Sequence, residues 1–264
     1  MTRTDTRSTW ALREAGSGAV YVTPDPEPDG ASVWFFTRLG GVSEAPYESL
    51  NVSTKVGDGE EAVSENLARI RSSMHDNETA WVRQQAGDRV YRVDAPGMAG
   101  EGDALVSSEA GLSLVVAVAD CVPVALASRD EVGMVHSGWR GTLAGVSGNA
   151  VREMSPEPAD VAAYIGPCIR GCCYEVSEEI AADFERRFGA GVAEGRYLSL
   201  PEAIKRNLEE AGVCEIHDLG LCTGCRPDLF YSHRKQKPTT GRNLTAVARA
   251  VEPGNSGDLK AREA

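Results

Sequence analysis

The sequence predicts an α/β (α+β) fold, a single domain with a mixed β-sheet packed by helices. Apolar runs of strand length are mixed with longer segments whose apolar residues recur at helical spacing, without a strict strand–helix alternation. No internal repeat or low-complexity linker divides the 264 residues, and 42% hydrophobic content is enough to build one large core. We expect residues 1–15 to be a loose N-terminal segment, 16–251 to form the domain and 252–264 to be a disordered tail.

Strand signals are short β-rich runs bounded by turn residues. The run Leu112–Leu126 is the longest and is nearly all apolar, which is typical of a buried central strand. The expected strands are Ala19–Val22, Ser32–Thr37, Arg89–Val93, Leu112–Leu126, Gly133–His136, Val161–Ile165, Ile216–Leu221 and Leu244–Ala248.

Helix signals rest on periodicity and on capping residues. Val63, Leu67 and Ile70 recur at helical spacing, and Ser177 is a favourable N-cap before two glutamates. Pro201 stands where a first helical turn tolerates it. We expect helices over 60–74 and 143–154, the latter following Thr142, another after Ser177, and a fourth from Pro201 to near Gly212.

Charge and cysteine content exclude several classes of protein. The formal net charge of −12 disfavours binding to nucleic acid and to anionic membrane surfaces. The sequence has no apolar run of about 18 residues and no signal-peptide pattern at its start, so a membrane span or secretion is not expected. Seven cysteines, an odd number in a chain of this length, indicate thiols kept in a reducing cytoplasm.

The segment ADCVPVALASRDEVGMVHSGWRGT, residues 119–142, carries the strongest signal for chemistry. The charged turn Arg129–Glu131 lies between two apolar strands and predicts an antiparallel hairpin. With the turn centred between Arg129 and Asp130, Cys121 and His136 come within two positions of facing each other. Both side chains then lie on one face, so a thiol and an imidazole are expected to converge.

A cysteine and a histidine at one place support two chemistries. Together they could ligate zinc or copper, or His136 could activate Cys121 as a nucleophile. The third reading is a buried cysteine beside a structural histidine. The polar, glycine-rich surroundings, with Asp120 before Cys121 and SGWRGT after His136, favour the functional readings.

Two segments are candidates for binding an anion. GWRGT reads as a strand-to-helix turn in which Thr142 caps the next helix, so its amides and Arg140 could hold a phosphate or carboxylate. TRLGGVS places Arg38 at a strand end, and the following LNVSTKVGD offers Asn51 and Asp58 as orienting groups. A salt-bridged surface arginine and a plain surface turn are the alternatives.

The remaining cysteines lie in two knots. Cys168, Cys172 and Cys173 belong to IGPCIRGCCYEV, whereas Cys222 and Cys225 form CTGC. We interpret them as buried thiols at loop turns, because the two knots are far apart in sequence and CIRGCC is not a standard ligand pair. A structural zinc site and a redox pair are the alternatives.

The other histidines carry weaker signals. His75 ends a helix and His217 starts a strand, whereas His233 lies in the polar loop FYSHRKQKPTTGRN. In that loop, Arg234 and Arg242 are equally expected to face a substrate or solvent.

Several of these motifs together resemble the laccase-domain or polyphenol oxidase proteins, also described as purine nucleoside phosphorylases with adenosine deaminase activity. The matching pieces keep their order over nearly the whole chain, and ADCVPV with VHSGWRGT is the most specific. The others are TRLGGVS, LNVSTKVGD, GDALVS, YIGPCIRGCCYEV, LCTGC and TTGRN.

The resemblance implies a single α/β domain and a zinc site made by two histidines and one cysteine. It maps onto Cys121 and His136 as metal ligands and catalytic residues, with purine nucleoside and phosphate as the substrates. The family's other histidine lies in a Gln-x-His-Gly motif, where this chain has Gln84, Gln85, Ala86 and Gly87. Because a methyl group cannot bind metal, zinc is expected to be weakened or absent here.

Three functions therefore remain open. The first is phosphorolysis of adenosine, inosine or methylthioadenosine, with Arg38, Asn51 and Arg140 holding substrate or phosphate and with deamination impaired. The second is a metal-free cysteine hydrolase using Cys121 and His136. The third is a degenerate nucleoside-binding protein without turnover. Copper oxidase chemistry is the least expected, because it needs many histidine ligands and the chain has four histidines.

Overall fold

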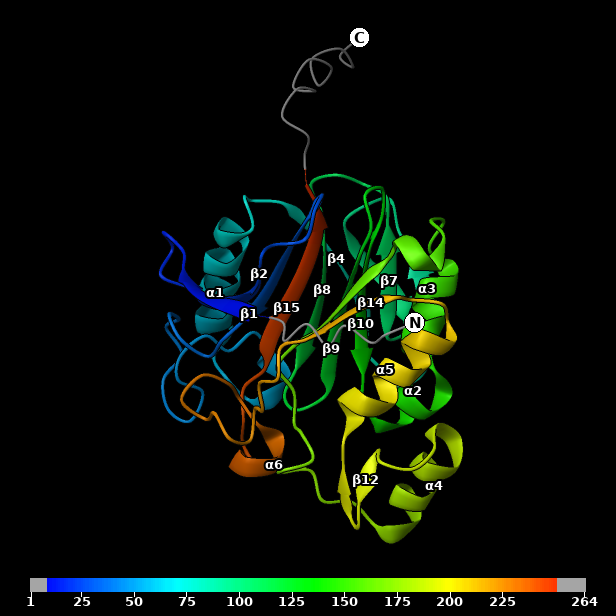
Figure 1. Ribbon diagram of the computed structural model, residues 1–264. Coiled ribbons are helices and arrows are strands. Elements are labelled where there is room, and N and C mark those ends of the chain that lie inside the picture. Colours follow the sequence, from blue (N-terminus) through cyan, green and yellow to red (C-terminus); the bar gives the residue numbers. More distant parts are fainter. Residues whose placement is uncertain (1–8, 251–264) are drawn as a thin grey trace.

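The structure, a computed structural model, describes residues 9–250 and contains two large β-sheets packed face to face with helices on their outer faces (Figure 1). The α/β (α+β) class is confirmed, but the strands form two mixed sheets where a single sheet is predicted. No helix among the described residues is long and apolar enough to cross a membrane.

The first sheet has seven strands in the order β1-β2-β3-β15-β8-β4-β6. Their bounds are Thr9–Glu14, Val20–Asp25, Ala31–Phe36, Asn243–Arg249, Leu112–Val118, Glu78–Arg83 and Gly97–Glu101. The second sheet has six strands in the order β14-β11-β9-β10-β7-β5. Their bounds are Glu215–Asp218, Ala162–Ile165, Val122–Ala127, Val132–Ser137, Ala104–Ser107 and Val90–Arg92. A small ribbon pairs β12 (Ala193–Glu194) with β13 (Tyr197–Leu198).

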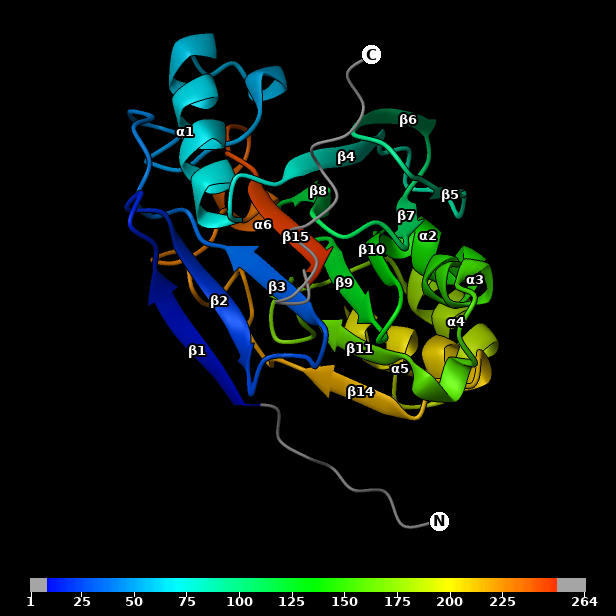
Figure 2. The ribbon, with the colours of Figure 1, turned by 90° about the horizontal axis from the view of Figure 1, so that it is seen from above.

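Most of the helices lie on the outer faces of these sheets, and the shortest lies at their lower end in Figure 1. They are α1 (Glu60–Ser73), α2 (Trp139–Ala144), α3 (Val146–Glu153), α4 (Glu178–Phe188), α5 (Leu200–Glu210) and α6 (His233–Gln236), with short 3-10 turns at Thr54–Val56 and Pro158–Asp160. Helix α1 packs on the first sheet, and α3, α4 and α5 lie on the side of the second (Figure 2). Ser177 caps α4 as predicted, because its hydroxyl accepts a hydrogen bond from the backbone N–H of Ile180.

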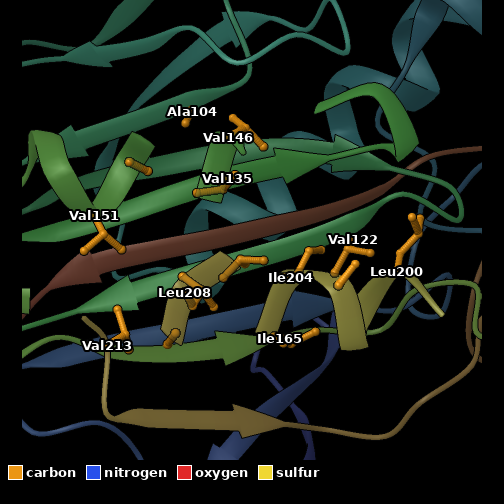
Figure 3. Packing of buried hydrophobic residues seen from close by; sticks show 14 of the residues in the cluster. Ala104, Val122, Val135, Val146, Val151, Ile165, Leu200, Ile204, Leu208 and Val213 are labelled. Carbon is orange, nitrogen blue, oxygen red and sulfur yellow. The ribbon is translucent and has the colours of Figure 1, made fainter. Parts of the chain in front are cut away.

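Three apolar clusters hold these layers together. Leu114 and Val116 of one sheet pack with Ala125 and Met134 of the other in the central cluster. A second cluster joins the outer face of the six-stranded sheet to α3 and α5, as the labelled side chains of Val135, Val151, Ile165, Ile204 and Leu208 illustrate (Figure 3). The sheets are therefore buried on both faces over much of their area, which explains the long apolar runs in the sequence.

The prediction of one central strand over Leu112–Leu126 is wrong. The run contains two strands, β8 and β9, which belong to different sheets. They are separated at Ala119–Cys121, where Asp120 adopts a left-handed conformation with φ 88°. A continuous apolar run hides this break because both strands are buried.

The predicted hairpin is confirmed, register included. Strands β9 and β10 are antiparallel, with Ala127 facing Val132 and Val122 facing Ser137. A turn centred between Arg129 and Asp130 gives this pairing. Cys121 lies one residue before β9, so continuing the register brings it opposite Gly138.

Two further predictions need correction. Thr142 does not cap a helix running to Met154, because α2 already begins at Trp139 with Gly138 as its N-cap, and the helix breaks at Gly145, where φ is 80°. Residues 9–14, expected within the loose segment 1–15, form strand β1, because they find a partner in β2. The rest of that segment, residues 1–8, and the tail predicted over 252–264 lie outside the described residues.

Candidate active site

Cys121, His136 and Ala86 surround one point beside Gly138. A methyl group placed on Gly138 would lie 3.3 Å from the Sγ atom of Cys121, 4.0 Å from the Cβ atom of Ala86 and 4.0 Å from the Cε1 atom of His136. The thiol and the imidazole therefore converge as the hairpin predicts. A larger residue at position 138 would push against the sulfur, which is one reason for a glycine there.

Asp120 fixes the backbone that presents Cys121. Its carboxylate accepts a hydrogen bond of 2.6 Å from the hydroxyl of Thr223 and another of 2.6 Å from the backbone N–H of Arg234. A left-handed φ at a residue other than glycine costs free energy and persists only where the surroundings impose it. The two contacts supply that constraint, and they attach two distant loops to the break between the sheets.

Asp103 organises the other half of the site. It is fully buried, and its Oδ1 lies 2.8 Å from the Nδ1 of His136. The same carboxylate accepts hydrogen bonds from the backbone N–H groups of Gln85, Ala86 and Gly87, the last two at 2.9 and 2.7 Å. One buried group thus orients the imidazole and holds the loop that carries Ala86.

The protonation of this pair follows from its contacts. Burial alone would lower the pKa of His136, but the charge of Cys121 and the hydrogen bond with Asp103 raise that pKa to about 9. Burial alone would raise the pKa of Asp103, but the hydrogen bonds from His136 and Gly87 lower it overall. With Nδ1 engaged by Asp103, the second ring nitrogen of His136 is the one available to Cys121.

Cationic side chains gather around the thiol. Arg242 is half-buried, and although burial lowers its pKa, the charges of Cys121 and Asp120 oppose that effect. Burial, and then the neighbouring Cys121, raise the pKa of the Tyr174 hydroxyl. The ring of Tyr174 lies under the guanidinium of Arg234, 5.1 Å from its centre.

None of the three arginines near this point forms an ion pair with a carboxylate of residues 9–250. Arg242 donates to the carbonyls of Thr240 and Gly241, and Arg234 donates to the carbonyl of Glu175. Arg140, the third, is exposed and stacks on the ring of its neighbour Trp139 at 4.2 Å. Guanidinium groups without carboxylate partners can accept an anionic ligand.

Arg38 is engaged elsewhere. It donates to the carbonyls of Glu48 and Pro227 and stacks on Tyr231 at 4.7 Å, with only 14% of its side chain exposed. These contacts tie two loops together, so its expected role toward phosphate has no direct support in the geometry.

Asn51 is fully buried and has no spare hydrogen-bonding group. Its Nδ2 donates to the carbonyl of Ser53 and to Asp58, and its Oδ1 accepts from the backbone N–H groups of Ser53 and Arg242. Asn51 therefore reaches the site indirectly, by fixing the backbone of Arg242.

The donor set does not fit the zinc centre that the resemblance implies. Cys121 and His136 supply two ligands, and the methyl group of Ala86 stands on the third side. Of the other histidines, His75 packs against Trp34, His217 stacks on Tyr164, and His233 is the first residue of α6. Within residues 9–250, the one group of three or more candidate metal ligands is a cluster of cysteines that includes neither Cys121 nor His136.

Sequence reasoning missed Asp103 and undervalued Asp120. A signal for Asp103 existed, because a functional histidine commonly donates one ring N–H to a carboxylate, and GDALVS supplies an aspartate before a strand. The sequence alone does not decide whether Arg234 and Arg242 face a substrate or solvent. In the structure both lie in the neighbourhood of Cys121.

Comparisons with known proteins agree with the resemblance seen in the sequence. Residues 32–250 match a family model described as multi-copper polyphenol oxidoreductase laccase. The purine nucleoside phosphorylase of Deinococcus radiodurans is 36% identical over 239 residues, covering 86% of this chain and 92% of the relative. Purine nucleoside phosphorylase SCO2081 of Streptomyces coelicolor is 39% identical over 228 residues, covering 81% and 93%.

The fold is shared with solved structures. The crystal structure of YlmD from Geobacillus stearothermophilus superimposes with a TM-score of 0.81 at 30% identity, covering 92% of this chain and all of the other. A Neisseria meningitidis protein, NMB0706, gives a TM-score of 0.78 at 26% identity.

Proposed function

This chain belongs to the multi-copper polyphenol oxidoreductase laccase family, and we propose that it works as a purine nucleoside phosphorylase. In this reaction phosphate attacks the C1′ atom of the ribose and the bond from C1′ to the purine breaks. The products are the free base and ribose 1-phosphate, or 5-methylthioribose 1-phosphate when the substrate is methylthioadenosine. Adenosine, inosine and methylthioadenosine are the proposed nucleosides. The alignments with two relatives named purine nucleoside phosphorylase extend over most of each relative and over most of this chain.

One observation supports the proposal above all: the thiol of Cys121 and the imidazole of His136 lie beside arginine side chains that form no ion pair with a carboxylate of residues 9–250. Phosphate is a dianion near neutral pH, and arginines bind such groups through charge-assisted, often bidentate hydrogen bonds. On a chain with a net charge of −12, a local cationic group is needed to attract phosphate. We assign phosphate binding to Arg140, Arg234 and Arg242, with Asn51 as a positioning residue for the last.

His136 and Asp103 have distinct roles in this proposal. The raised pKa keeps the imidazole of His136 protonated near neutral pH, so it can donate a hydrogen bond to phosphate or a proton to the departing purine. Asp103 does not reach the substrate and acts by holding the ring of His136 in one orientation. Cys121 lies against the same point and contributes a polarisable sulfur atom beside the reacting groups.

We propose that deamination is the weaker activity. Deamination of adenosine requires an activated water, which a bound metal usually supplies, and the third ligand position here holds Ala86. Phosphorolysis uses phosphate as its own nucleophile and therefore survives the loss better. Faster formation of inosine than of free adenine from adenosine would contradict this ordering.

A coupled assay tests the main proposal. Release of purine from each nucleoside is measured with and without phosphate, for the wild type, Cys121→Ser, His136→Gln and the exposed control Cys214→Ser. We expect phosphate-dependent release that falls by about 100-fold or more in the first two variants and stays unchanged in the control. Base release that does not depend on phosphate, or no release at all, would refute the assignment.

A metal-free cysteine hydrolase is the second candidate, because Asp103, His136 and Cys121 follow one another as carboxylate, base and thiol do in nucleophilic triads. Incubation with an activated ester, followed by mass spectrometry, separates the two: an acyl group on Cys121 supports the hydrolase. Nucleoside binding without any product would instead indicate a degenerate site. In each case we propose a cytoplasmic protein, because the cysteines are all free thiols.

A further inference from the structure

Four cysteines that take no part in the Cys121 site come together at a second place. Cys172 and Cys173 lie on one loop and Cys222 and Cys225 on another, and all four sulfur atoms are within 4.8 Å of one another. The Sγ of Cys225 lies 3.5 Å from the Sγ of both Cys172 and Cys173. The two knots, which the sequence suggests are separate groups of buried thiols, are therefore one cluster, in which Cys172 and Cys225 are exposed.

The backbone of both loops presents these sulfurs in tight turns. The N–H groups of Cys225 and Arg226 both donate to the carbonyl of Cys222, at 3.2 and 3.1 Å. On the other loop, the N–H groups of Cys173 and Tyr174 both donate to the carbonyl of Arg170, at 2.8 and 2.9 Å. A Cys-x-x-Cys turn closed in this way is the usual frame of one half of a zinc-binding knuckle.

The loops are also joined directly to each other. The N–H of Cys168 donates to the carbonyl of Leu221 at 3.2 Å, and the N–H of Thr223 donates to the carbonyl of Cys168 at 2.9 Å. This short parallel bridge between Cys168 and Cys222 holds the two turns side by side. The backbone therefore brings the four sulfur atoms together.

We propose that Cys172, Cys173, Cys222 and Cys225 bind one zinc ion in a tetrahedral, structural site. A Zn–S bond of about 2.3 Å places the four sulfurs of a tetrahedron about 3.8 Å apart, which is within the spread of this cluster. Four thiolates with no open position are the ligand set of a closed structural zinc site, and soft sulfur ligands select zinc over magnesium or calcium.

The zinc would stabilise the two loops that contact Asp120 and its neighbours in the candidate active site. Thr223, between the two cysteines of the second loop, donates to Asp120, and Tyr174, which follows Cys173 directly, stacks under Arg234, whose backbone N–H also donates to Asp120. Both loops therefore connect the cluster to the residues that hold the thiol. The inference does not depend on the reaction proposed above, because it concerns the folded structure alone.

The test uses the full chain without an affinity tag, purified under reducing conditions with zinc present and then dialysed. Elemental analysis is expected to give about one zinc per chain for the wild type, for Cys121→Ser and for Cys214→Ser, and none for Cys222→Ser/Cys225→Ser. Cys214 is a matched control, since it is an exposed free thiol outside the cluster. Loss of zinc in Cys121→Ser alone would place the metal at the other site and overturn the inference.

A second measurement avoids variants that fold poorly. Brief alkylation of the zinc-loaded wild type, read by peptide mass spectrometry, should label Cys214 at once and leave the four cluster cysteines protected until a strong chelator is added. Replacing zinc with Co²⁺ should give the visible absorption of a tetrahedral thiolate complex. Free, rapidly labelled thiols without metal, or a disulfide between Cys225 and either Cys172 or Cys173 in the freshly purified protein, would overturn the inference.

Discussion

Replacing Asp103 with asparagine removes one charge while keeping the shape of the most connected side chain at the site. The Oδ1 atom accepts hydrogen bonds from Ala86 and His136, whereas Oδ2 accepts from Gly87 at 2.7 Å, and Gln85 lies 3.2 Å from both. In Asp103→Asn one of these oxygens becomes an NH₂ group. Whichever way the amide turns, a donor then faces a donor.

The magnitude follows from these contacts. With the amide oxygen kept toward His136, the contact with Gly87 and part of that with Gln85 are lost. Each hydrogen bond to a charged group contributes about 1.5–3 kcal/mol, and the half-exposed loop lets water replace some of that. We therefore expect the free energy of unfolding to fall by about 3 kcal/mol, a large share of the 5–15 kcal/mol typical of a domain.

Urea unfolding followed by tryptophan fluorescence at neutral pH measures this change. Asp130→Asn is the matched control, because Asp130 is exposed in the hairpin turn and only its carbonyl takes part in a described contact, so a change within about 0.5 kcal/mol is expected. The kcat for phosphorolysis should fall by about 100-fold as His136 loses its orientation. An Asp103→Asn variant within 1 kcal/mol of the wild type would refute the view that this carboxylate holds the loop.

Three other variants probe separate parts of the chain. Ala86→His should add a third ligand beside the Cys–His pair and raise the zinc content by about one equivalent over the wild type in elemental analysis; unchanged content would show that position 86 does not face the pair. Arg242→Ala should raise the KM for phosphate about 10- to 100-fold with little change in the KM for nucleoside, whereas the surface control Arg13→Ala should change neither. Burial opposes ionisation of Asp218, but Arg170 lowers its pKa from 3.8 to about 2, so its stabilisation is complete above pH 4 and is lost as pH falls toward 2. The difference in unfolding free energy between the wild type and Asp218→Asn should accordingly shrink by about 1 kcal/mol between about pH 6 and about pH 3, and a constant difference would contradict the assigned pKa.

The local features of the site were predictable from sequence, because they depend on residues that are close along the chain. The turn after Ser128 sets the register of the hairpin, and the register sets the meeting of Cys121 with His136. Asp103 is 33 residues from His136 in sequence, and strand β7, which follows Asp103, pairs with β10 through contacts that no local pattern encodes.

The division into two sheets was hidden for a different physical reason. Strands β8 and β9 are buried on both faces, so neither shows the alternation that would mark a face or an end. Only Asp120, a polar residue in the middle of the apolar run, signals the break. The cysteine cluster was likewise hidden, because its halves meet through the bridge between Cys168 and Cys222 rather than through sequence proximity.

Ala86 changes the ligand set of the site without changing its frame. Its N–H still donates to Asp103, and its backbone has φ 59°, a left-handed conformation that the hydrogen bonds of the loop impose. Since the same carboxylate also contacts His136, Asp103 links position 86 to the imidazole directly. Ala86→His should therefore alter the chemistry with little effect on stability, whereas Asp103→Asn should alter both. A large loss of stability in Ala86→His would mean that the loop accommodates only a small side chain at position 86, and would contradict this reasoning.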